Sequence, residues 1–214
     1  MAILVRPASI LVAGVALATA VGLSAAPALA AGKTWTISPG GAISAKAKNA
    51  TVTDTTSGNS LTCKSSTMKG KLKAGKKLAG KAAGTVSGFT ITGCSIEGQA
   101  ITVKPSHLPW KLNLVSYNKA KGVTTATLTG IHIKITVAAL GCSAIVDGTK
   151  STADNGMITV TYTNKTGVLK TQTKGGNLKL YGVTSGCLGV INSGDKVALG
   201  ASYTVTKKQK ITSP

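Results

Sequence analysis

The sequence contains no arginine after Arg6, only five acidic residues and only seven aromatic residues in a chain of 214. The planar guanidinium group of arginine forms paired hydrogen bonds with phosphate, and aromatic side chains stack on bases. Because both are scarce, we expect no specific nucleic-acid partner. Lysine supplies all the remaining positive charge, and the formal net charge is +20. Such a surface favours solubility or diffuse attraction to polyanions.

The sequence also lacks the motifs of common enzymes, such as G-x-S-x-G, H-E-x-x-H or a glycine-rich phosphate loop. Of its two histidines, His107 lies in a turn and His132 on the polar face of a strand, so both are expected at the surface. Asp147, Asp154 and Asp195 neighbour glycine or asparagine, where an aspartate caps its own backbone. We therefore predict a non-enzymatic protein with no catalytic, cofactor-binding or metal-binding residues. A small secreted hydrolase or an enzyme inhibitor is the alternative.

The N-terminus has the layout of a secretory signal peptide. Arg6 precedes an apolar run over residues 10–23, and Ala28-Leu29-Ala30 follows. The run is shorter than the roughly 20 residues that a spanning helix needs. We predict that residues 1–30 are a signal peptide cleaved after Ala30, that no transmembrane segment remains, and that the protein is secreted and associated with the cell envelope. An uncleaved membrane anchor is the alternative.

The chain contains four cysteines, Cys63, Cys94, Cys142 and Cys187. An even number in an exported chain predicts disulfides, for which three pairings are possible. Pairing Cys63 with Cys94 and Cys142 with Cys187 gives both halves the same layout and does not require them to interlock, so we predict these two bonds. The alternative is a zinc site, but zinc sites normally contain close cysteine pairs, and this sequence has none.

Threonine, valine and isoleucine alternate with period two over most of the chain after Lys33, for example at 101–104 and 158–163. This composition and period predict strands, and one-sided alternation is typical of antiparallel sheets. The parity of the apolar residues changes at Gly130, which predicts a bulge there. The fold class is therefore all-β, an antiparallel β-sandwich or barrel-like domain with two disulfide-closed loops and a suggestion of internal duplication.

Residues 31–214 are long enough to bury a core, and we expect a single secreted β domain. Two small domains, 31–121 and 122–214, are the alternative. Trp35 and Trp110 lie on alternating apolar faces and are expected in the core. Two similar segments, each with a tyrosine followed five residues later by Gly-Val, predict hairpins closed by a left-handed glycine at 122 and at 167.

Lysine is concentrated in one segment, at Lys64, Lys69, Lys71, Lys73, Lys76, Lys77 and Lys81. The glycines at 70, 75 and 80 are spaced by five, which matches no helical face, so residues 67–83 are predicted to be a mobile basic loop. We predict that the seven lysines bind a polyanion, either an anionic cell-wall polymer or a lipid surface. A solvated face without a partner is the alternative.

Three short segments carry a resemblance to a known group of proteins: Leu108-Pro109-Trp110-Lys111-Leu112, residues 142–148, and Asp154-Asn155-Gly156. In these the chain resembles small secreted actinobacterial proteins of uncharacterised function, and the similarity extends over most of the mature region. The resemblance implies export and a β fold, and it implies no activity. The lysine-dense segment 64–81 is where we expect this chain to depart from its relatives.

Overall fold

Strands make up nearly all of the regular structure in the residues that the computed structural model describes, 33–96 and 98–214. The strands are β1 (Thr34–Ser38), β2 (Gly41–Asp54), β3 (Ser60–Leu72), β4 (Gly75–Ala79), β5 (Gly84–Ile96), β6 (Gln99–Ser106), β7 (Trp110–Asn118), β8 (Val123–Val137), β9 (Cys142–Asp147), β10 (Gly156–Thr163), β11 (Val168–Thr171), β12 (Lys179–Tyr181), β13 (Val197–Gly200), β14 (Ser202–Val205) and β15 (Lys210–Thr212). Two 3-10 helices are also present, η1 (Ala138–Leu140) and η2 (Ser185–Cys187). None of the helices in this part of the chain has the length and apolar character to span a membrane. The predicted signal peptide and its cleavage site lie outside the described residues.

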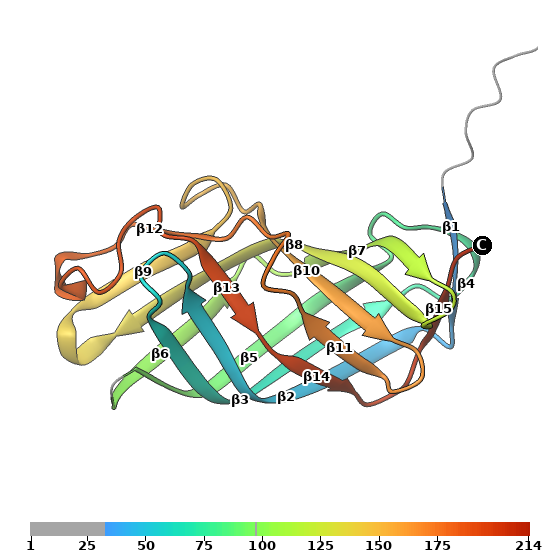
Figure 1. Cartoon of the computed structure of the whole chain (residues 1–214), viewed down its shortest axis with the longest axis horizontal. Coiled ribbons are helices and arrows are strands. Elements are labelled where there is room, and N and C mark those ends of the chain that lie inside the picture. Colours follow the sequence, from blue (N-terminus) through green and yellow to red (C-terminus); the bar gives the residue numbers. More distant parts are fainter. Residues whose placement is uncertain (1–32, 97) are drawn as a thin grey trace, which may run out of the picture. The chain divides into compact units, whose positions relative to one another are not determined.

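Eight strands form a closed antiparallel ring, which we call the first ring (Figure 1). Its order is β10, β11, β14, β2, β3, β5, β7 and β8, and β8 pairs with β10 to close it. The prediction of an all-β, antiparallel, barrel-like fold is therefore confirmed. β1, β4 and β15 form a separate small sheet at one end. Trp35 of β1 and Ile211 of β15 are buried in the same core as the ring interior, so this sheet covers that end.

A second ring is built on the same long strands. β6 lies between β5 and β8, β9 pairs with β8, β12 with β9, and β13 with β2. Backbone hydrogen bonds from Leu180 to Asp195 and from Val197 to Leu178 join β12 to the start of β13. The second ring therefore runs through β2, β3, β5, β6, β8, β9, β12 and β13. It shares four strands with the first ring.

The change from one ring to the other occurs at irregular positions in the long strands. In β8, residues before Gly130 pair with β7 and β10, and residues from His132 onward pair with β6 and β9, while Ile131 still pairs with Gly156 of β10. Gly130 has a φ of 87°, and the β8–β10 register shifts beside it, so the predicted bulge is confirmed. Asn49 and Gly93, in β2 and β5, also have left-handed backbones. The extra residue at Gly130 bends β8 and lets this strand serve both rings, whereas the pairing of β2 and β5 with β3 keeps its register across Asn49 and Gly93.

The tryptophan and hairpin predictions are confirmed. Trp35 and Trp110 are 1% and 2% exposed. Gly122 and Gly167 close the β7–β8 and β10–β11 hairpins with φ values of 61° and 71°. The described residues form one compact unit, and the alternative division at 121–122 falls within the β7–β8 hairpin.

Candidate functional site

The cavity inside the second ring is larger than the space that side chains leave inside the first ring. The first ring encloses about 80 Å³, and the second about 300 Å³. Leucine, isoleucine, valine, alanine and the Cys142–Cys187 pair form most of the wall of the larger cavity, and its polar lining residues are Asp54, Asn59 and Gln99. A volume of this size lies at the lower end of the range for small-molecule sites, which are mostly apolar with few polar groups.

The rim of this cavity exposes apolar side chains. Four large apolar residues are exposed in the described part of the chain, and three of them, Leu140, Leu188 and Val190, are at this end. Leu140 and Val190 line the cavity, and Leu188, at 78% exposed, follows Cys187 directly. Because single exposed apolar residues are common but clusters mark contact sites, this rim is a candidate entrance for an apolar ligand.

Two tethers hold the segment that forms the rim. The predicted disulfide between Cys142 and Cys187 is present and joins β9 to η2. The Asn59 side-chain amide, in the turn between β2 and β3, donates a hydrogen bond of 2.7 Å to the Val190 carbonyl. The rim is therefore fixed to both sides of the second ring.

Asp54 is buried in the wall of the cavity at the end of β2. Its carboxylate accepts hydrogen bonds from the Thr56 and Ser57 backbone N–H groups and from the Ser57 hydroxyl. Burial raises the pKa of Asp54, but these hydrogen bonds outweigh it and leave the pKa below its usual value. The carboxylate is thus occupied with shaping the turn that carries Asn59.

The predicted Cys63–Cys94 disulfide is also present. It joins directly opposed residues of β3 and β5. Both bonds confirm the predicted pairing.

The seven predicted polyanion-binding lysines are all exposed, but they do not lie in a mobile loop. That prediction is wrong, because residues 60–72 and 75–79 are the strands β3 and β4. Lys64, Lys69 and Lys71 lie on β3, while Lys73, Lys76, Lys77 and Lys81 lie on and around β4.

Two of the three glycines in this segment, Gly70 and Gly80, lie where neighbouring groups leave no room for a side chain, so they reflect packing rather than flexibility. Gly70 is buried between β2 and β5, and a Cβ there would lie only 2.0 Å from the Thr85 carbonyl oxygen. The pairing of β2 with β3 also places two further lysines, which are distant in sequence, beside the lysines of β3. Lys46 of β2 pairs with Thr67, and Lys48 with Ser65, on the outward face that carries Lys69 and Lys71. We call Lys46, Lys48, Lys64, Lys69 and Lys71 the lysine face.

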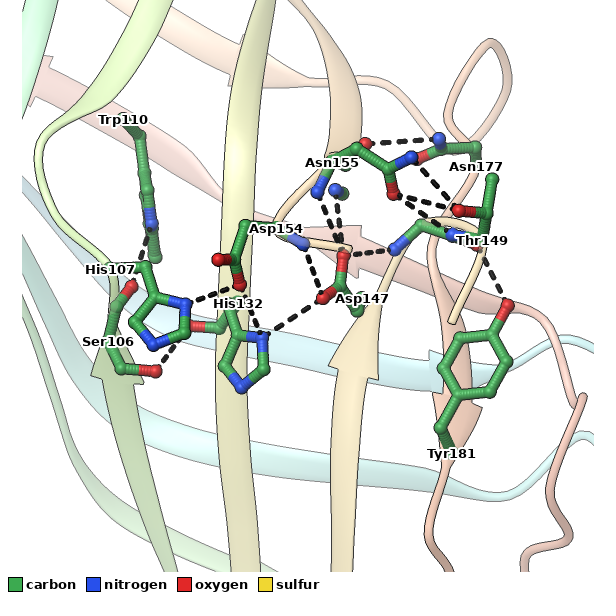
Figure 2. Close-up of polar contacts among 12 residues, drawn as sticks. Ser106, His107, Trp110, His132, Asp147, Thr149, Asp154, Asn155, Asn177 and Tyr181 are labelled. Carbon is green, nitrogen blue, oxygen red and sulfur yellow. Dashed lines mark hydrogen bonds and ion pairs between the residues drawn. The ribbon is translucent and has the colours of Figure 1, made fainter. Parts of the chain in front are cut away.

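A cluster of polar side chains lies outside the second ring, where β6 and β9 end beside the middle of β8 (Figure 2). His132 is only 8% exposed, so its predicted place on the surface is wrong. It points away from the ring interior, and Nδ1 lies 3.0 Å from Asp147 Oδ2 and 3.1 Å from Asp154 Oδ1. His107, which is exposed as predicted, contacts the same Asp154 oxygen through its own Nδ1.

Asp147 anchors this cluster. It is completely buried, and its carboxylate accepts hydrogen bonds from the backbone N–H groups of residues 148 and 154–156 as well as from His132. The expectation that Asp147 caps its own backbone is therefore confirmed. Asp195 does the same for the Asn192 N–H. Asp154 differs, because its side chain contacts the two imidazoles instead.

Comparison with known proteins gives one match. Residues 6–188 match the family described as "Alkane oxidation protein activator PraA/PraB-like". No curated protein and no solved structure matches the chain.

Proposed function

The chain belongs to the PraA/PraB-like family of alkane oxidation protein activators, and from this premise we propose that it is an exported, non-enzymatic protein that binds an alkyl chain in the second-ring cavity. The family description names alkane oxidation as the process that is activated. An activator can act on such a process by holding the poorly soluble substrate in water. The cavity of about 300 Å³ is the observation that carries this proposal.

The chemistry of the cavity suits a saturated chain. Its wall is almost entirely aliphatic, and a hydrocarbon has no polar group that would need a partner. Each methylene group transferred from water contributes about 0.8 kcal/mol, so burying about eight of them contributes roughly 6 kcal/mol before the costs of binding. The exposed Leu140, Leu188 and Val190 extend the apolar surface beyond the cavity, where the rest of a longer chain can lie.

The lysine face supplies a second part of the proposal, adhesion to an anionic cell-wall polymer or lipid surface. No lysine is among the described residues that line the cavity, whereas the lysine face lies on the outer side of β2 and β3. Cavity and charged surface are therefore separate and can act together. The formal net charge of the full chain is +20, and no arginine follows Arg6, which favours diffuse attraction of this kind over recognition of a defined group.

Filling the cavity should abolish binding of an apolar probe. Ala144 of β9 is 2% exposed and lines the cavity. We expect Ala144→Phe to weaken binding of N-phenyl-1-naphthylamine at least tenfold, because the ring occupies the space that the probe needs. Fluorescence titration of the exported protein, followed by displacement with dodecane, measures this.

The matched control for Ala144→Phe is Ala42→Phe, since Ala42 is exposed on β2. It adds the same side chain outside the ring and should leave the affinity unchanged. Melting temperatures show whether Ala144→Phe is still folded. If dodecane fails to displace the probe from the wild-type protein, or if a folded Ala144→Phe binds it normally, the alkyl-binding proposal is wrong.

Removing lysines tests the adhesion proposal separately. Replacing the five residues of the lysine face, Lys46, Lys48, Lys64, Lys69 and Lys71, by glutamine should change the melting temperature little, because exposed charges contribute little to folding. Retention on isolated anionic cell wall should fall strongly at low salt and disappear for both proteins at several hundred millimolar salt.

The control removes the same charge elsewhere, from the exposed Lys104, Lys119, Lys121, Lys134 and Lys150. If this second set reduces retention as much as the first, adhesion depends on net charge alone. Unchanged retention for the first set would contradict any adhesive role for those lysines.

A further inference from the structure

Both histidines of the chain and one of its five acidic residues converge outside the second ring (Figure 2). His107, His132 and Asp154 each offer one ligand atom, and these atoms all lie within 4.8 Å of one another. The cavity and the lysine face do not use these residues. The cluster therefore needs an explanation independent of the proposed function.

The distances fit the first coordination shell of a metal ion. Zinc binds imidazole nitrogen at about 2.0–2.1 Å and carboxylate oxygen at about 2.0–2.2 Å, so neighbouring ligand atoms of a tetrahedral zinc ion are separated by about 3.3–3.5 Å, slightly more than the contacts between these atoms without the ion. The separation between His132 Nδ1 and Asp154 Oδ1 is 3.1 Å. His107 Nδ1 contacts the same oxygen more closely, and a small rotation of its exposed ring widens that contact.

The cluster combines one fixed ligand with two adjustable ones. The His132 side chain is 10% exposed, whereas those of His107 and Asp154 are 53% and 43% exposed. Asp147 holds both His132 and the backbone of Asp154, since its Oδ2 lies 3.0 Å from His132 Nδ1 and accepts the Asp154 N–H at 3.0 Å. Asp147 therefore fixes the orientation of the His132 ring and the position of the Asp154 backbone at the point where the ligand atoms meet.

The backbone also brings the two adjustable ligands to the same point. His107 and Asp154 have φ values of 54° and 50°, in the left-handed region that residues with a side chain rarely adopt. Such conformations persist where the surrounding structure enforces them, often at functional sites. Here they place residues from the β6–β7 and β9–β10 connections over His132 of β8.

We propose that His107 Nδ1, His132 Nδ1 and Asp154 Oδ1 bind a divalent transition-metal ion of the zinc class. Imidazole with carboxylate is a borderline donor set, which suits zinc and not calcium. Binding displaces the protons that the imidazoles share with the carboxylates in the metal-free protein. Asp147 Oδ2, which lies 3.0 Å from His132 Nδ1, is then placed to be the fourth ligand and the second oxygen of the set. The two carboxylates supply negative charge at this one point of a strongly basic chain.

Calorimetric titration of zinc chloride into the untagged exported protein, freed of metal by a chelator that is then removed, tests the proposal. We expect one zinc ion per chain and no saturable heat with calcium. His107→Ala and Asp154→Asn should each weaken zinc binding about 10- to 100-fold, the range seen when groups of a metal site are lost. Asp195→Asn is the control, because Asp195 caps a turn elsewhere and should leave zinc affinity unchanged.

Thermal unfolding separates loss of the site from loss of the fold. Without zinc, His107→Ala should melt near the wild-type temperature, because its side chain is half exposed, and zinc should raise the melting temperature of the wild-type protein only. Two results would overturn the proposal. One is the absence of saturable zinc binding to the wild-type protein, which would make the cluster a hydrogen-bond network. The other is zinc binding by His107→Ala and Asp154→Asn with the same affinity as the wild-type protein, which would place the ion elsewhere.

Discussion

Replacing Asp147 by alanine is expected to lower the free energy of unfolding by about 3–5 kcal/mol, the largest effect that we predict for a single substitution. The carboxylate is fully buried and accepts hydrogen bonds from four backbone N–H groups, those of residues 148 and 154–156, at 2.6–3.1 Å. Alanine leaves these donors without a partner and leaves His132 without its buried acceptor. The β9–β10 connection then loses the group that determines its path.

Thermal and urea unfolding of Asp147→Ala measure this effect. For a chain of this length we expect the melting temperature to fall by roughly 10 °C or more. Asp195→Ala is the control, since that side chain accepts one exposed backbone N–H and its loss should cost about 1 kcal/mol. If the melting temperature of Asp147→Ala falls no further than that of Asp195→Ala, water replaces the carboxylate as the hydrogen-bond acceptor.

Protonation of Asp147 is also expected to lower the stability of the fold at low pH. Burial raises the pKa of Asp147, but the hydrogen bonds from Gly148, His132, Asp154 and Asn155 outweigh it, so the pKa lies below its usual value. A depressed carboxyl pKa contributes stability above the unfolded-state value of about 3.9, and that contribution is lost as the pH falls through the folded-state value. Asp147→Ala should therefore lose stability less steeply than the wild-type protein below about pH 4.

Removing the Cys142–Cys187 disulfide by a double substitution to alanine is expected to cost about 4 kcal/mol and to abolish probe binding in the cavity. The bond spans a sequence separation of 45, for which the chain-entropy estimate is about 4 kcal/mol. It also tethers η2 and the apolar rim to β9, and both cysteines line the cavity. Stability and affinity should therefore fall together.

The matched control is the double alanine variant of Cys63 and Cys94, whose separation is 31. Its cost in chain entropy is similar, about 3.7 kcal/mol, but its residues face each other across paired strands that stay aligned without the bond. We expect this variant to lose stability and to keep probe binding. If both variants bind the probe equally well at a temperature where both are folded, the rim does not depend on the Cys142 tether.

The strands, both disulfides and the Gly130 bulge could be predicted because each leaves a local mark in the sequence. Alternation reveals which side of a strand faces apolar surroundings, and a change of parity reveals where the strand bends. Alternation says nothing about a further layer on the polar side. It therefore predicts that His132, between Ile131 and Ile133, faces solvent, whereas the connection carrying Asp147 and Asp154 covers it.

The lysine-rich segment shows a different limit of sequence reasoning. Glycine marks flexible turns, but it also marks places where two backbones approach closely, and Gly70 beside Thr85 is of the second kind. The cavity could not be predicted for another reason. Its wall comes from all eight strands of the second ring, and only the register of the whole sheet brings these segments together.

β8 contributes a wall to both rings and changes partners at Gly130, which has a consequence for how the domain comes apart. Detaching β8 from either ring breaks its pairing with two neighbouring strands, and the detached half stays covalently continuous with the half that is still paired. Local opening that detaches β8 at the cavity end therefore also disturbs the part of β8 that is packed in the first ring, which raises the free energy of that opening. The hollow end, which would be marginal by itself, takes its cooperativity from the filled end.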